Sequence, residues 1–226
     1  MGAQLCAPLI MLFNNLNMQN RWLLIICTFI YLLLYYILYT QVFDAQLFQM
    51  MFENSSDETN TLYDIYNKVS CFIILIATTS VLIRLLVVSL LMYGSYSVAK
   101  ETFKIRDIQF ASFLKCTLYA ESAYILQHIV QLYRYINEIP SKISDFSKVP
   151  LSLYSLMGSE EMEGWMIYSL NTLNLFEVVY CVILMLSFKK TMKLTKKDSF
   201  NLLTLTYFPI LLLNYILRIG IQLLTM

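Results

Sequence analysis

Charged residues are scarce in this chain, and the few cations do not gather into one basic region. Charged side chains make up 14% of the 226 residues, whereas an ordinary soluble domain carries about 25%. The formal net charge is +1, and the lysines and arginines occur in short clusters between apolar runs. Binding to nucleic acid needs a strongly basic face. The composition therefore argues against both a soluble domain and a nucleic-acid partner.

Glycine and histidine are also rare, which leaves little material for the common catalytic sites. The chain has five glycines and one histidine, and it contains no Walker A loop, GxSxG, HExxH or dinucleotide-binding fingerprint. Its five cysteines form no CxxC pair, so the spacing typical of a metal site is missing. We therefore predict that the protein is not an enzyme and that it uses no cofactor or metal.

Long apolar segments are what the chain has in abundance. Hydrophobic residues make up 58% of it, and five segments reach the roughly 20 apolar residues that a helix needs to cross a bilayer. The sequence thus predicts an all-α polytopic membrane helix bundle of about five transmembrane helices. A short N-terminal segment, residues 1–21, precedes a single transmembrane bundle, residues 22–226. The expected spans are residues 22–39, 69–93, 110–132, 166–188 and 202–224.

The charges of the connecting loops predict an orientation, because loops rich in lysine and arginine stay in the cytoplasm. Residues 94–109 carry three cations and residues 189–199 carry five lysines, whereas residues 41–68 are acidic and residues 133–165 end in an acidic cluster. The sign alternates from loop to loop, as five spans require. We expect the N-terminus in the cytoplasm and the C-terminus outside, in a bacterial cytoplasmic membrane.

Three charged residues lie near the centres of predicted spans: Arg84 on the second, Glu121 on the third and Glu177 on the fourth. Ionisable groups inside a bilayer are costly and usually pair with one another or mark a pathway. Either carboxylate lies at a suitable depth to neutralise Arg84. The hypothesis of an intramembrane charge network has two versions, a structural pair or triad and a pathway for a solute or protons.

Other polar residues on the last three spans are candidate accessory groups. On the fourth span they recur every three residues and on the fifth every four, which predicts stripes that hydrogen-bond to neighbouring helices. A histidine seven residues after Glu121 allows a proton relay, although a hydrogen-bonded structural role is favoured. These candidates are Lys115, His128, Asn171, Asn174, Asn214 and Arg218.

The second half of the chain resembles a known family of membrane proteins. The run LNTLNLFE at residues 170–177 opens a span, a lysine-rich loop follows, and the last span contains Pro209. This order is similar to that of the Yip1-domain family, and the resemblance covers residues 69–224. It implies five spans with a cytoplasmic N-terminus. Eukaryotic members of that family act in membrane trafficking with small GTPases, and some bacterial relatives are described as transporter permeases.

Two functions remain open at this stage. The first is a non-enzymatic scaffold or accessory subunit that binds other membrane proteins and uses an exposed basic loop toward anionic lipid or an acidic partner. That loop contains Lys189, Lys190, Lys193, Lys196 and Lys197. The second is a permease-like subunit that moves a small solute or ion along the intramembrane charges. A water-accessible cavity touching those charges favours the second, and a tightly packed centre favours the first.

Overall fold

The computed structural model describes residues 18–38, 59–103, 107–137, 148–157, 162 and 164–224. The regular elements among these residues are all helices, as the composition predicted. They are α2 Met18–Ile37, α4 Thr59–Phe103, α5 Phe110–Ala120, α6 Ser122–Asn137, α8 Leu153–Met157, α9 Gly164–Thr172, α10 Leu175–Thr191 and α11 Lys196–Leu224. Most of the expected N-terminal segment and of the acidic connection before α4 lies outside the described residues.

Three of these helices are long and apolar enough to cross a membrane. The segments are Met18–Ile37, Phe72–Val98 and Lys196–Leu217. Their outward faces carry large apolar side chains, such as Phe29, Leu90 and Leu212, each at least half exposed. In water such apolar surfaces would promote aggregation, whereas in lipid they are in a favourable solvent. The part of the chain that the structure describes is therefore that of an integral membrane protein.

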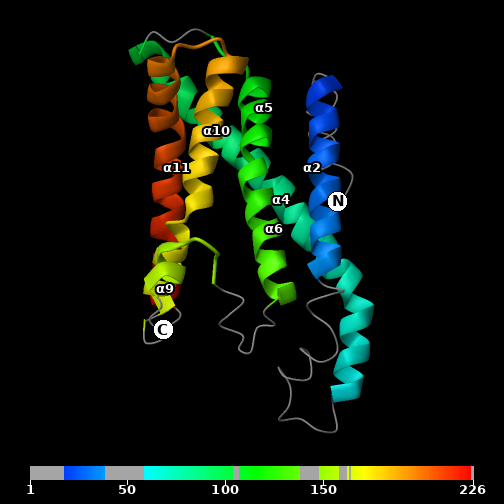
Figure 1. Cartoon of the computed structure of the whole chain (residues 1–226). Helices are drawn as coiled ribbons and strands as arrows, with labels where there is room; N and C mark the ends of the chain where they lie inside the picture. Colours follow the sequence, from blue (N-terminus) through cyan, green and yellow to red (C-terminus); the bar gives the residue numbers. More distant parts are fainter. Residues whose placement is uncertain are drawn as a thin grey trace.

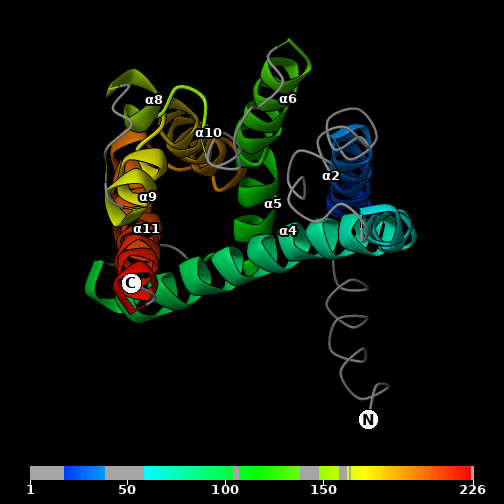
Figure 2. The same ribbon diagram turned by 90° about the horizontal axis from the view of Figure 1, so that it is seen from below.

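Helix α4 crosses the other helices diagonally and connects the two sides of the bundle (Figure 1). Seen from below, it extends from α2 at one edge to α11 at the other (Figure 2). It packs against α2, α5 and α11 in turn. With 45 residues and a rise of 1.5 Å per residue its length is about 68 Å. The span predicted over residues 69–93 lies within this helix and overlaps its apolar segment Phe72–Val98, and the helix extends beyond the span on both sides.

The predicted third span is two helices with a bend between them. Helices α5 and α6 meet at Glu121, yet the backbone bonds continue across the junction: Glu121 N–H donates to Thr117 at 2.9 Å, and Ile125 N–H donates to Glu121 at 3.0 Å. The span expected over residues 110–132 is therefore covered by two successive helices. Because the bonds persist, residues 110–137 form one bent rod that passes through the bundle.

The predicted fourth span is also interrupted, at Leu173 and Asn174. The segment 151–153 pairs with this interruption, since Leu153 N–H donates to Leu173 at 3.0 Å and Leu175 N–H donates to Leu151 at 3.1 Å. The Asn174 side chain then accepts from Glu177 N–H at 2.9 Å and caps α10. Asparagine at an N-cap satisfies a backbone donor that a helix start leaves free. The single helix expected over residues 166–188 is therefore wrong.

The basic connection before α11 is shorter than the sequence suggested. Helix α10 extends to Thr191 and α11 begins at Lys196, because Thr195 and Asp198 form a reciprocal cap. Asp198 N–H donates to Thr195 Oγ1 at 3.1 Å, and the Thr195 hydroxyl donates to Asp198 Oδ2 at 2.7 Å. Such a cap fixes the first turn of a helix. Lys193, in the turn itself, adopts a positive φ of 54°.

At the other basic connection, Lys100 at the end of α4 donates to Asp107 Oδ1 at 2.8 Å. This hydrogen bond and the charge of the lysine lower the pKa of Asp107 from its ordinary value. Both groups lie outside the apolar segment of α4. The carboxylate is fully exposed, so the pair mainly orients the connection and adds little stability.

The main core lies where α4, α5, α10 and α11 meet, and several aromatic rings pack within it. Phe113 contacts Tyr93, Tyr96 and Phe188, with ring centroids 5.4 to 6.0 Å apart. The two glycines whose surroundings are described, Gly94 and Gly220, have no atoms of other elements nearby. Close packing here comes from interlocking rings and small hydroxyl residues instead of glycine contacts.

Two leucines on α10 provide a test of this packing. Leu184 is fully buried in the core, whereas Leu186 is 52% exposed on the outer face. Lipid is as apolar as leucine, so the transfer of the side chain from lipid to the core contributes little. Leu184→Ala should therefore lower the free energy of unfolding only by the cost of the cavity that it leaves, on the order of 2 kcal/mol. Leu186→Ala, the matched control, should leave stability nearly unchanged. The measurement is the unfolding free energy in detergent micelles, and equal losses for the two variants would contradict the described packing.

Candidate functional site

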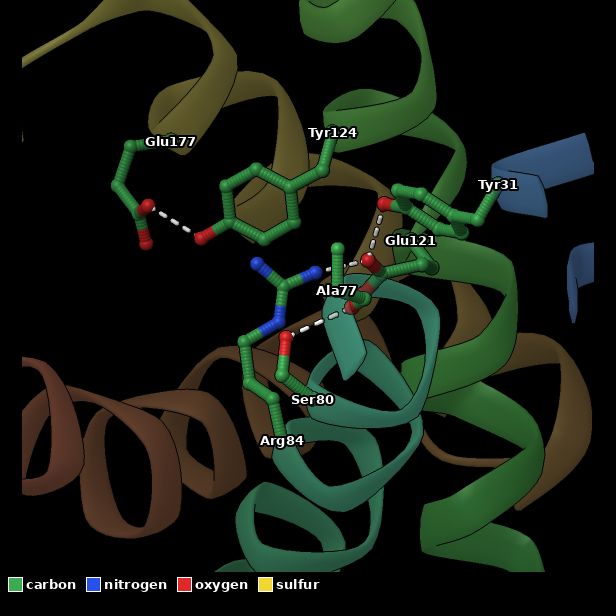
Figure 3. Close-up of polar contacts among 7 residues, drawn as sticks. All are labelled: Tyr31, Ala77, Ser80, Arg84, Glu121, Tyr124 and Glu177. Carbon is green, nitrogen blue, oxygen red and sulfur yellow. Dashed lines mark hydrogen bonds and ion pairs between the residues drawn. The ribbon is translucent and has the colours of Figure 1, made fainter. Parts of the chain in front are cut away.

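Arg84 on α4 and Glu121 at the junction of α5 and α6 form an ion pair inside the bundle (Figure 3). The Glu121 side chain is 1% exposed, whereas that of Arg84 is 41% exposed. A lone charge at this depth would be costly, and pairing offsets part of that cost when further hydrogen bonds complete the geometry. The pair therefore joins α4 to the α5–α6 rod at the point where the rod bends.

A tyrosine from the first span completes the surroundings of Glu121. The hydroxyl of Tyr31, on α2, donates to Glu121 Oε1 at 2.5 Å. Tyr31 is 1% exposed, so this bond is shielded from water and from the charged lipid surface. Three helical elements thus converge on one carboxylate, two of them through hydrogen-bond donors.

Glu177, in the first turn of α10, lies on the other side of Arg84 and is bound by two other tyrosines. Tyr124 donates to its Oε2 at 2.5 Å and Tyr207 donates to its Oε1 at 2.7 Å. The ring of Tyr124 also faces Arg84, whose Cζ lies 4.5 Å from the ring centroid. Tyr124 is therefore the bridge between the ion pair and Glu177, through its ring on one side and its hydroxyl on the other (Figure 3).

A cavity of about 360 Å³ opens beside these groups. It touches all three charged residues that the sequence singled out, and α4, α6, α9, α10 and α11 all contribute to its wall. The polar residues of the wall are Arg84, Glu121, Tyr124, Thr172, Glu177, Tyr180, Tyr207 and Asn214. The remainder is aliphatic. A volume of this size holds several waters or one small organic molecule.

Local sequence features explain why these side chains meet here. Glu121 lies at the helix bend, and Glu177 lies one turn after the Asn174 cap. The N-terminal turn of a helix is the positive end of its dipole and favours a carboxylate. Each of the two carboxylates therefore lies at or just after a helix interruption that the sequence did not reveal.

Lys115 and His128 do not join this site, although both were candidates. Lys115 donates to Gln19 Oε1 at 2.8 Å near the start of α2. His128 packs edge-on against Tyr31 and Tyr35, with ring centroids 5.6 and 5.8 Å away. Neither residue lines the cavity. In the structure both serve the contact between α2 and the α5–α6 rod.

The three candidate asparagines have different roles in the structure. Asn171 accepts from Val149 N–H at 3.2 Å and from the Ser152 hydroxyl at 3.0 Å, so it holds the segment before α8 against α9. Asn174 caps α10. Asn214 on α11, in contrast, lines the cavity. The side chain of Arg218 lies outside the described residues.

The five candidate lysines of the basic connection are all exposed. They lie around the turn between α10 and α11, at the end of the bundle that also holds the connection between α4 and α5 (Figure 1). Ile108 and Leu194 from these two connections pack against the same core. The two basic connections therefore share one end of the molecule, away from the cavity's acidic residues.

Three tyrosines of the site, Tyr31, Tyr124 and Tyr207, were not among the candidates. With 17 tyrosines in the chain, nothing in the sequence distinguished the three that hold carboxylates. A usable signal exists only for Tyr124, which lies three residues after Glu121 and so on a neighbouring face of the helix. Tyr180, three residues after Glu177 on α10, also lines the cavity.

Comparisons with known proteins do not assign a function to this site. No protein-family model matches the chain, and no curated protein or solved structure is significantly similar to it. The resemblance to the Yip1-domain family stays a prediction. Within the described ranges, no group of histidine, cysteine, aspartate or glutamate is arranged to hold a metal ion.

The ion pair can be tested by a double-mutant cycle. Arg84→Leu leaves Glu121 as a buried unpaired charge and should be strongly destabilising, by about 3–5 kcal/mol. Glu121→Leu leaves only the partly exposed Arg84 unpaired and should cost less. The loss in the double variant should be smaller than the sum of the two single losses, by a coupling energy of about 1–3 kcal/mol. The measurement is the unfolding free energy of each variant in the same detergent.

The matched control is a second double-mutant cycle, in which Arg84→Leu is combined with Glu177→Leu. No direct ion pair joins Arg84 to Glu177 among the described contacts, so their coupling should be clearly smaller. A coupling between Arg84 and Glu177 as large as that between Arg84 and Glu121 would refute the assigned pairing.

Proposed function

We propose that this protein is a permease-like membrane subunit that binds a small polar solute or ion in its intramembrane cavity. The observation that carries this proposal is the cavity of about 360 Å³ in contact with Arg84, Glu121 and Glu177. A protein that used its charges only to hold helices together would have no need of open space beside them. Binding sites in membrane bundles typically combine such a cavity with a few ionisable groups.

The proposal includes five spans with a cytoplasmic N-terminus. Two elements beyond the three long helices support that count. The bent rod of residues 110–137 is about 42 Å long at 1.5 Å per residue, and α10 passes through the core beside it. Successive passes run in alternate directions (Figure 1). The two basic connections lie at the same end, which agrees with a cytoplasmic location for that end.

A test of the cavity uses the reaction of introduced cysteines with a charged, membrane-impermeant thiol reagent. Only a thiolate in contact with water reacts quickly. In a variant whose five native cysteines are replaced by alanine, Val88→Cys on the cavity wall should be labelled readily. Leu90→Cys on the lipid face of the same helix should be labelled far more slowly. The measurement is the labelling rate in proteoliposomes.

Two results of that experiment separate the alternatives. If Leu213→Trp, which fills part of the cavity wall, slows labelling of Val88→Cys, the accessible space is the cavity described here. If Val88→Cys and Leu90→Cys react equally slowly, the centre of the bundle is dry and the permease-like function fails.

A second function, a scaffold or accessory subunit, is supported by a different feature. The exposed lysines around the turn between α10 and α11 form a compact positive surface that can contact anionic lipid or an acidic partner. Replacing Lys189, Lys190, Lys193, Lys196 and Lys197 by glutamine should weaken co-purification of a partner in mild detergent. Arginine at the same positions keeps the charge and should preserve it. Unchanged recovery with glutamine would remove the scaffold function.

A further inference from the structure

We infer that the cavity takes a monovalent organic cation, an amine with an apolar body, whose ammonium group binds Glu177. This inference rests on the proposed function and specifies its ligand. Its basis is the distribution of charge and of apolar surface around the cavity, considered residue by residue.

The charges that line the cavity do not balance. In their ionised forms, Arg84 contributes one positive charge, and Glu121 and Glu177 contribute one negative charge each to the cavity wall. Arg84 is paired with Glu121, so the positive charge is already compensated. Among the described residues, no cationic side chain forms an ion pair with Glu177. One negative charge at the cavity wall is therefore left for a ligand to neutralise.

Hydrogen-bond donors hold Glu177 in place at the cavity wall. Each of its two carboxylate oxygens accepts a hydrogen bond from a tyrosine hydroxyl, and its own N–H is held by the Asn174 cap at the positive end of α10. A carboxylate offers about four acceptor sites, so two tyrosine donors leave capacity for the N–H donors of an ammonium group. Tyr180 lines the same cavity, and its hydroxyl has no hydrogen-bond partner among the described residues.

The rest of the wall is suited to an apolar body. The side chains of Leu85 and Val88 on α4 and of Ile210 and Leu211 on α11 line the same cavity and offer no oxygen. A bare inorganic cation needs about six oxygen ligands around it, and this aliphatic part of the wall provides none from its side chains. An organic amine needs only a few hydrogen bonds and gains from apolar contact along its carbon chain.

The position of the cavity allows such a ligand to reach it from the bilayer. Several residues of its wall, among them Val87 on α4 and Leu213 and Leu217 on α11, are about half exposed on the outer face of the bundle. The cavity therefore extends to the lipid-facing surface between α4 and α11. An amine with an apolar body partitions to the same depth as these side chains.

The experiment compares three probes of the same size with purified protein in lipid nanodiscs. The probes are n-butylammonium, 1-butanol and butyrate, which differ in charge but share the butyl chain. A ligand that binds only the folded state raises its thermal stability. We expect a saturable rise in Tm with n-butylammonium and no saturable rise with butanol or butyrate.

Variants assign the effect to the site. Glu177→Gln should abolish the rise with n-butylammonium, and Tyr180→Phe, a milder change that retains the ring, should weaken it severalfold. Lys197→Gln, on the exposed basic connection and absent from the cavity wall, should leave it unchanged. A rise that persists in Glu177→Gln, or one that is lost in Lys197→Gln, overturns the assignment to Glu177.

The failure of this inference and the failure of the proposed function give different results. If butyrate raises the Tm and n-butylammonium does not, the cavity binds an anion at Arg84; the inference is then overturned and the permease-like function stands. If no probe binds and Val88→Cys is also unreactive, both are overturned.

Discussion

The ion pair between Arg84 and Glu121 is the interaction on which the arrangement of this bundle depends. It lies where α4 crosses the α5–α6 rod, and Tyr31 brings α2 to the same carboxylate. Tyr124 extends the contact to Glu177 on α10, which Tyr207 joins to α11. Every long helix of the described structure therefore reaches this centre within one or two polar contacts. In lipid, where apolar contact alone does little to order helices, such contacts specify which faces meet.

The same centre explains why the bundle keeps a cavity. Aromatic rings pack the end of the bundle near the basic connections, around Phe113. The cavity lies beside the three ionisable groups instead, and residues of α4, α10 and α11 line it. Rigid packing at one end and open space at the charged centre form an arrangement that suits binding of a polar solute within the bilayer.

Much of this could be predicted from the sequence, but not its most informative details. The length of the apolar segments predicted a helical membrane protein. The cost of placing ionisable groups inside a bilayer singled out Arg84, Glu121 and Glu177. The helix interruptions at Glu121 and Asn174 were missed because neither glycine nor proline marks them; the second depends on pairing with residues 151–153, which only tertiary structure brings near. The tyrosines that hold the carboxylates were missed because tyrosine is common along the whole chain.

The most direct test of the central ion pair is a distance measurement in lipid. Solid-state NMR on protein in liposomes, with ¹⁵N in the arginine side chains and ¹³C in the glutamate carboxyl groups, detects a guanidinium and a carboxylate in direct contact through their dipolar coupling. Among the described residues, the structure places Arg84 and Glu121 in such a contact inside the bundle, and this contact should disappear in Glu121→Gln and persist in Glu177→Gln. A coupling that is absent, or that disappears in Glu177→Gln instead, would contradict the account.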